Sequence, residues 1–182
     1  MLLDHHAEVN SSHKKVCVTA VHWASGNGEV AIAWLLLANG ADANAKDRDN
    51  QTPLHWAIND GVARVLLDYG ADLNAQDSGN RTPLHRAMRW GGTEVARVLL
   101  EKGVDANARS FTNRTPLYMA SEFGHLDGVR LLLQHGADIH ARDDEGRTPF
   151  KVASASASAF PPKRQDIMQL LLEHGAEDHR TR

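Results

Sequence analysis

The chain has 182 residues, with 20 lysines and arginines against 23 aspartates and glutamates and a formal net charge of -3. This near-balance provides no general electrostatic attraction to nucleic acids or to anionic membranes. Apolar residues make up 42 % of the sequence and charged residues 24 %, which is typical of a soluble globular protein and too apolar for a disordered one.

A four-residue phrase led by threonine recurs five times along the chain. The copies begin at Thr19, Thr52, Thr82, Thr115 and Thr148 and read TAVH, TPLH, TPLH, TPLY and TPFK. Successive threonines are 33, 30, 33 and 33 residues apart. A second phrase, Gly-Ala-Asp or a close variant, keeps a similar spacing and begins at Gly40, Gly70, Gly103, Gly136 and Gly175. Two markers in register indicate a repeat protein.

Each copy predicts two short helices separated by a turn. Threonine is a good N-cap because its side chain accepts a hydrogen bond from the first turn, and proline suits the first helical position. In most units a glycine follows and is expected to end the first helix. These glycines are Gly28, Gly61, Gly91 and Gly124. Leucine pairs end the second helix, at 36–37, 66–67, 99–100, 132–133 and 171–172. A lone helix pair cannot bury these leucines, so we expect the units to stack.

With these phrases and this period, the sequence resembles the ankyrin repeat family, whose units are about 33 residues long and carry Thr-Pro-Leu-His. The resemblance covers nearly the whole chain. It implies an all-α repeat solenoid of stacked helix-turn-helix units with short β-hairpin-like finger loops, entered through 44–45, 74–75 and 107–108. It also implies that the inner helices and fingers line a concave side, and that the histidine of each Thr-Pro-Leu-His braces its turn by hydrogen bonding.

The markers divide the chain into one ankyrin-repeat domain over residues 1–178 and a tail over 179–182. The expected parts of the domain are a partial repeat at 1–10 and repeats at 11–45, 46–75, 76–108, 109–141 and 142–178. The partial repeat is inferred because residues 2–10 align with residues 36–44, the end of a unit without its beginning. We therefore expect the natural protein, or its ancestor, to extend further towards the N-terminus.

Two repeats differ from the common length. The second has 18 residues from Thr52 to Gly70, where three others have 21. Alignment places the gap just after Gly61, which predicts a shortened outer helix and a local change in stacking angle. In the fifth repeat Gly175 follows Thr148 by 27 positions, and the six extra residues fall within 154–162. Because this segment ends in two prolines, it predicts an exposed loop before a last helix that begins near Asp166.

The sequence contains no pattern typical of a catalytic, cofactor or metal site. Six of the 11 histidines have places in the repeat template: His22, His55, His85, His125, His135 and His174. His5 and His6 are adjacent, without the i, i+4 spacing that presents two ligands on one helical face. There is no Gly-x-Ser-x-Gly, no phosphate loop and no sequence-local partner that would activate Cys17. Repeated aspartates at 42, 72, 105 and 138 indicate a structural role in a turn. We predict no enzymatic activity, no cofactor and no metal.

Residues that vary while the template stays constant are the candidates for binding a partner, because template positions are committed to packing. One residue before a threonine stand three arginines, and eight residues after it stand two aromatic residues. Together with nearby variable columns, the candidates are Arg81, Arg86, Arg89, Trp90, Phe111, Arg114, Met119, Glu122, Phe123 and Arg147. Tryptophan, tyrosine and arginine are the residues that most often anchor protein interfaces.

A packing role is the alternative for the same residues. Trp90 and Phe123 would then only stack on each other, and the arginines would pair with Asp77, Asp143 or Asp144. Trp23 and Trp56 are expected to pad repeats one and two.

Taken together, the sequence predicts a monomeric protein–protein interaction module, a scaffold or adaptor that binds a partner protein on its concave face. The alternative is an architectural or sensor segment of a larger multidomain protein. Neither nucleic acid nor membrane is an expected partner, since the longest apolar runs are far shorter than the roughly 20 residues of a membrane span. The single cysteine allows no internal disulfide, and the N-terminus lacks the features of a signal peptide. We expect a cytoplasmic protein, with the nucleus as a second possible location.

Overall fold

The computed structural model describes residues 9–13, 16–155 and 161–176. These described residues form ten helices and no strand longer than a single bridge, between Ser12 and Thr19. The chain divides into two compact units, Met1–Pro83 and Leu84–Arg182, and each is described by itself. Outside the described residues lie residues 1–8 of the expected partial repeat, residues 156–160 of the insertion and the tail at 179–182.

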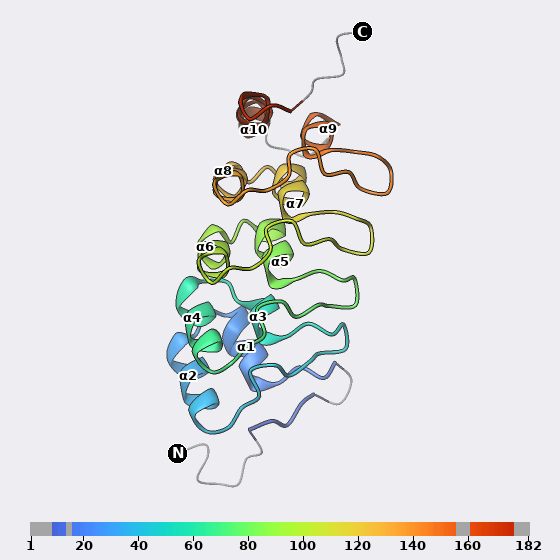
Figure 1. Cartoon of the computed structure of the whole chain (residues 1–182). Helices are drawn as coiled ribbons and strands as arrows, with labels where there is room; N and C mark the ends of the chain where they lie inside the picture. The colour runs from blue at the N-terminus through green and yellow to red at the C-terminus, as the bar shows by residue number, and fades with distance from the viewer. Residues whose placement is uncertain (1–8, 14–15, 156–160, 177–182) are drawn as a thin grey trace. The chain divides into compact units, whose positions relative to one another are not determined.

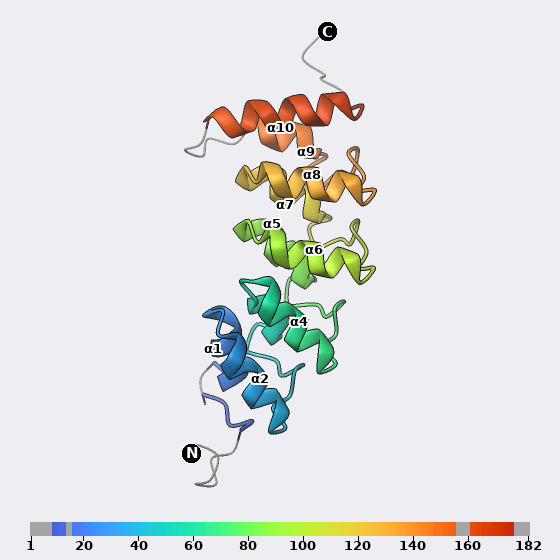
Figure 2. The same ribbon diagram turned by 90° about the vertical axis from the view of Figure 1, so that its left-hand side faces the viewer.

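Both units are built from helix pairs, one inner and one outer helix per repeat (Figure 1). The inner helices are α1 (Ala20–Gly26), α3 (Pro53–Trp56), α5 (Pro83–Trp90), α7 (Pro116–Phe123) and α9 (Pro149–Ala155). The outer helices are α2 (Val30–Ala38), α4 (Asp60–Asp68), α6 (Thr93–Glu101), α8 (Leu126–Gln134) and α10 (Pro161–Glu173). In the first unit α1 packs on α3 and α2 on α4; in the second, α7 packs on α9, and α8 lies between α6 and α10. Figure 2 shows the outer helices of each unit side by side. The predicted all-α repeat solenoid is confirmed.

The Thr-Pro phrase begins the inner helices as predicted. Proline is the first residue of α3, α5, α7 and α9. The Thr115 hydroxyl accepts a hydrogen bond from the Tyr118 amide, and the Thr148 hydroxyl accepts one from the Lys151 amide, both at 3.2 Å. At the other end of α7, Gly124 adopts a left-handed backbone with φ 77°, which glycine tolerates without strain.

The leucine pairs form the core of each unit. Leu66, Leu99, Leu132 and Leu171 are fully buried, and in the first pair Leu37 takes this place. Burial of each such side chain stabilises the fold by roughly 1.5 to 3 kcal/mol before the loss of entropy is subtracted. Because α1, α2, α7 and α8 each contact helices of a neighbouring repeat, stacking supplies this burial.

The second repeat is shortened in its inner helix, so the prediction of a shortened outer helix is wrong. Helix α3 is 4 residues long, whereas α4 is 9 residues long, the same length as α2, α6 and α8. Ala57 leaves the helical region with ψ 127°, which ends α3 after one turn. The Asn59 side chain then caps α4 by accepting a hydrogen bond from the Val62 amide at 2.9 Å. Gly61, expected to end a helix, lies inside α4 instead. The outer helix keeps its full length and its buried Leu66.

The last helix starts earlier than predicted. Helix α10 begins at Pro161, five residues before Asp166, and α9 continues to Ala155. Proline cannot continue a helix from the preceding residues, but its fixed backbone angle suits a helix that begins there. The prolines therefore mark the start of α10.

A ladder of asparagines links successive repeats within the first unit. Asn44 donates to the Gly70 carbonyl at 2.9 Å and accepts from the Asp72 amide at 2.7 Å. Asn10 makes the same two bonds one repeat earlier, to Gly40 at 3.0 Å and from Asp42 at 2.8 Å. Asn10 therefore occupies the position of Asn44, as the alignment of residues 2–10 with 36–44 predicts.

Candidate protein interface

Two of the finger loops are each organised by a buried aspartate at the base. The Asp77 carboxylate accepts hydrogen bonds from the Gly79 and Arg81 amides at 2.8 and 2.9 Å. Asp143 does the same for the amides of Glu145 and Arg147, at 3.0 and 2.8 Å. These aspartates fix the positions of Arg81 and Arg147, which precede Thr82 and Thr148. The aspartates at 42, 72, 105 and 138 accept one backbone hydrogen bond each in the preceding turn, which confirms their structural role.

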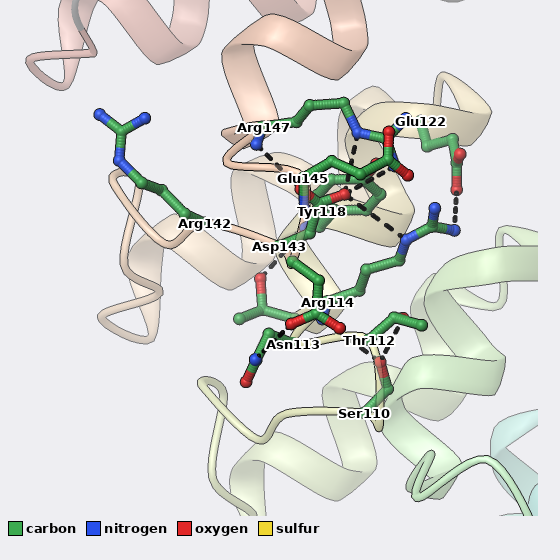
Figure 3. A network of polar contacts seen from close by, with 12 residues as sticks. Ser110, Thr112, Asn113, Arg114, Tyr118, Glu122, Arg142, Asp143, Glu145 and Arg147 are labelled. Atoms are coloured by element: carbon green, nitrogen blue, oxygen red, sulfur yellow. Dashed lines mark hydrogen bonds and ion pairs between the residues drawn. The ribbon is translucent and has the colours of Figure 1, made fainter.

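The three arginines that precede Thr82, Thr115 and Thr148 are paired with carboxylates. Figure 3 shows two of them, Arg114 and Arg147. Arg81 lies 2.8 Å from Asp77, and Arg147 lies 2.7 Å from Asp143. Arg114 contacts Asp143 and Glu122 at the longer distance of 3.8 Å each. For these arginines the alternative raised by the sequence holds: they pair with Asp77 and Asp143 and stabilise the fingers.

Tyr118 takes the histidine position of the fourth repeat and lies among these charges. The guanidinium carbons of Arg114 and Arg147 are 5.0 and 5.9 Å from its ring centre. Burial, and then the nearby Asp143 carboxylate, raise the pKa of the Tyr118 hydroxyl to about 12. Burial opposes ionisation of Asp143, but the hydrogen bonds from Arg147 outweigh it and hold the pKa of that carboxyl below its ordinary value of 3.8. At neutral pH the Tyr118 hydroxyl is therefore neutral and the Asp143 carboxylate charged. The charged carboxylate stays paired with Arg147, so we assign this network to the stability of the repeats.

The histidines of the Thr-Pro-Leu-His phrases brace the turns, as the resemblance implies, and they also reach the next finger. The imidazole Nε2–H groups of His22, His55 and His85 donate to the carbonyls of Gln51, Arg81 and Arg114 at 2.9 to 3.0 Å. In the first two phrases the other ring nitrogen accepts from the amide of the N-cap threonine, at 3.2 and 3.1 Å. Each Nε2 bond joins two repeats, so these histidines are structural.

An arginine–aromatic cluster lies at the ends of α5 and α7 in the second unit; it consists of Arg86, Arg89, Trp90 and Phe123. The Arg89 guanidinium carbon is 5.6 Å from the ring centre of Trp90 and 4.9 Å from that of Phe123. Arg86 lies 6.0 Å from the Trp90 ring centre. Trp90 is 69 % exposed, whereas Phe123 is half-buried. The two rings therefore share a guanidinium, which differs from the direct ring stacking that the alternative predicts.

Arg89 differs from the arginines at the finger bases in its charge partners. Among the described residues, no carboxylate pairs with its guanidinium, which contacts only the two aromatic rings. A cation over an aromatic face is stabilised by the ring quadrupole without losing its charge. The cluster therefore presents a positive, partly apolar surface.

The remaining sequence candidates occupy different environments. Met119 is 4 % exposed and packs inside the second unit, so its assignment to the exposed surface is wrong. Phe111, on the finger at 109–114, is 71 % exposed. Glu122 is engaged by Arg114. Arg81 belongs to the first unit and is not placed relative to the cluster.

Exposed apolar residues of the first unit were only partly anticipated. Trp56 is half-buried, donates to the Asp47 carboxylate at 3.2 Å and meets Trp23 edge to face, with ring centres 6.0 Å apart. Trp56 thus pads the repeats as expected, but Trp23 is 58 % exposed. Sequence reasoning missed the apolar outer face of α2, where three side chains are about half exposed: Ile32, Trp34 and Leu35. The signal was present, since the other outer helices carry Arg64, Arg97 and Arg130 at the position of Trp34.

The described residues contain neither a group of metal-ligating side chains nor a membrane-spanning helix. No three histidine, cysteine or acidic side chains gather there in a way that could hold a metal ion. No helix there is both long and apolar enough to cross a membrane.

Comparison with known proteins gives two findings. A family model of ankyrin repeats matches residues 1–77, 21–110, 62–143 and 108–182, which together span the chain. A curated relative, acyl-CoA-binding domain-containing protein 1 of Arabidopsis thaliana, is 37 % identical over 54 residues. That match covers 30 % of this chain and 16 % of the relative, so the chain corresponds to a small part of that protein's length.

Proposed function

Since the chain belongs to the ankyrin repeat family, whose members are generally protein–protein interaction modules, we propose that it is a scaffold or adaptor that binds a partner protein through the arginine–aromatic cluster. This surface lies on the inner helices of the second unit, the side expected to be concave. Phe111, on the neighbouring finger, is proposed to lie at its edge. Ankyrin repeat proteins are typically non-enzymatic, and no catalytic role is proposed.

The observation that carries the proposal is the exposure of Trp90 beside a stacked arginine. An exposed tryptophan leaves a large apolar area in water, and a partner that covers it gains the free energy of its burial. Tryptophan and arginine dominate the binding energy of measured interfaces. The paired arginines 81, 114 and 147 are framework residues by contrast, and we propose no direct role for their charges in binding.

A preformed surface favours affinity. Arg89 is already stacked on two rings, and α7, which carries Phe123, is capped at both ends, so binding immobilises few additional groups. Each side chain that is ordered before binding reduces the entropy lost in the complex.

The test uses Trp90→Ala in the full chain, with Trp34→Ala as the matched control. Both tryptophans are exposed, at 69 and 52 %, but Trp34 lies on α2 of the first unit. Proteins retained by the immobilised wild-type chain are identified, and their affinities for the variants are measured by calorimetry. We expect Trp90→Ala to weaken binding by roughly 1 to 3 kcal/mol with unchanged helical circular dichroism, and Trp34→Ala to have little effect.

Two outcomes would contradict this proposal. Equal affinities of wild type and Trp90→Ala would show that the cluster is not the interface. A loss of helical content that parallels the loss of binding would show that Trp90 serves packing.

A second function is supported by the likeness to the Arabidopsis protein, whose name includes an acyl-CoA-binding domain and of which the match covers 16 %. By this likeness, an architectural or sensor role within a larger multidomain protein is the alternative proposal. A purely architectural segment would retain no partner through the arginine–aromatic cluster, so the Trp90→Ala experiment separates the two.

A further inference from the structure

The inner helices of the second unit carry an excess of positive charge. Helix α5 contains Arg86 and Arg89 and no acidic residue, and α9 contains Lys151. Glu122 is the acidic residue of α7, and Arg114 already engages it. Although the whole chain has a net charge of -3, this surface is therefore complementary to an anion.

Within this surface Arg89 has the geometry of a prepared anion site. Its guanidinium is stacked over Trp90 and Phe123, and no described carboxylate neutralises it. A stacked guanidinium keeps the N–H groups at its edge available for hydrogen bonds, and its planar fork matches the two oxygens of a carboxylate. Stacking on both rings also restricts the side chain before any ligand arrives, which reduces the entropy lost on binding.

The exposed ring of Trp90 adds a second requirement for the ligand. It is 69 % exposed directly beside the guanidinium, so a ligand that pairs with Arg89 also meets an aromatic face. An apolar side chain placed there would be removed from water together with the ring. The surface thus fits a carboxylate next to an apolar side chain.

We propose that the arginine–aromatic cluster receives an acidic segment of the partner protein, in which an aspartate or glutamate pairs with Arg89 and a neighbouring apolar side chain packs on Trp90. This inference rests on the proposed function and specifies the chemistry of the partner at the same site.

The test compares three fluorescein-labelled peptides on the full chain by fluorescence anisotropy. The first peptide has glutamates on both sides of a Leu-Phe pair. The second has glutamine in place of every glutamate, and the third has phosphoserine at the same positions. We expect the acidic peptide to bind about tenfold more tightly than its amide twin at low salt. This preference should shrink as salt is raised, because the charge pair is at the surface.

Variants of Arg89 locate the preference. Arg89→Gln should abolish the difference between acidic and amide peptides, and Arg89→Lys should restore only part of it because lysine lacks the planar fork. The matched control is Arg97→Gln on α6, where the arginine is 46 % exposed and lies 3.5 Å from Glu94. This control should leave the preference unchanged.

The outcomes separate the inference from the proposed function. Equal binding of the acidic and amide peptides, with loss of both in Trp90→Ala, would overturn the acidic ligand and leave the interface standing. Binding of the phosphoserine peptide alone would replace the carboxylate by a phosphate and also overturn it. If none of the three peptides binds, the acidic-segment proposal fails. The proposed function is still judged by the retained proteins and their response to Trp90→Ala.

Discussion

At the scale of single residues, the framework uses buried polar groups whose protonation states are fixed by their hydrogen bonds. His22 is fully buried, donates from Nε2 to the Gln51 carbonyl and accepts the Thr19 amide at its other ring nitrogen. A proton on that second nitrogen would point at the N–H of Thr19 and remove this hydrogen bond, so the neutral imidazole is favoured. Burial, partly offset by the hydrogen bond to Gln51, lowers the pKa of His22 below 6.5.

This pKa shift predicts a loss of stability in acid. Because the folded-state pKa of His22 lies below the unfolded value, the unfolded chain binds more protons in acid. The contribution of His22 to the free energy of unfolding is therefore complete above pH 6.5 and is lost as the pH falls through the folded pKa. Urea denaturation measures the free energy of unfolding at pH 7.5 and at pH 5. The difference between the two values should be smaller in His22→Gln than in wild type. The same pH dependence in both proteins would contradict the assignment.

Asp143 is the second buried polar group that supports a prediction. Its carboxylate accepts from two finger amides and from the Arg147 side chain at 2.7 Å. Asp143→Asn should destabilise the chain by about 1.5 to 3 kcal/mol, because hydrogen bonds to a charged group are replaced. Chemical denaturation measures this, with Glu145→Gln as the control, since the Glu145 side chain is 66 % exposed. A destabilisation no larger than that of the control would show that the charge of Asp143 contributes nothing.

At the scale of helices and loops, repeated residues predicted more than residues that occur once. The Thr-Pro starts, the leucine pairs and the turn aspartates recur at one spacing, and the structure confirms their roles.

The shortened α3 was misassigned because the alignment treated Gly61 as equivalent to Gly28, Gly91 and Gly124, and a glycine alone does not report its backbone angle. Met119 was misassigned because variation between repeats does not distinguish exposed positions from buried ones. The pairing of the finger arginines with Asp77 and Asp143 was anticipated; the stacking of Arg89 depends on tertiary placement and was not.

The cap of α4 is the element that compensates for the shortened α3. Asn59 accepts from Val62 and donates to the Gly28 carbonyl at 3.0 Å, so its side chain connects α4 to the preceding turn. Asn59→Ala should cost about 1 to 2 kcal/mol, the effect of losing an N-cap. Thermal denaturation followed by circular dichroism checks this, with Asn27→Ala at the exposed end of α1 as the control. Identical melting temperatures for the two variants would mean that α4 does not depend on this cap.

At the scale of the whole molecule, charge is nearly balanced although the inner helices of the second unit are positive. The chain has 20 basic and 23 acidic residues, and Arg81 and Arg147 are paired with carboxylates within the fingers. This balance provides no general electrostatic attraction to the phosphate backbone of a nucleic acid. The positive charge is local and lies beside aromatic rings, which favours a protein segment as ligand.

This distribution predicts that the chain does not bind nucleic acid. On immobilised DNA or RNA at about 0.1 M salt, we expect the full chain to elute without a salt-dependent delay. Retention that decreases with salt and disappears in Arg89→Gln would instead assign the cluster to a nucleic acid.

The most direct measurement places a photoreactive benzoyl-phenylalanine at position 90 of the full chain, with the same replacement at position 34 as the reference. After irradiation in an extract that contains the partner, mass spectrometry identifies the cross-linked peptides. We predict cross-links from position 90 to one acidic segment of a single protein and no such product from position 34. Absence of a protein cross-link at position 90, or an identical set of products from both positions, would contradict the assignment of the arginine–aromatic cluster as the binding surface.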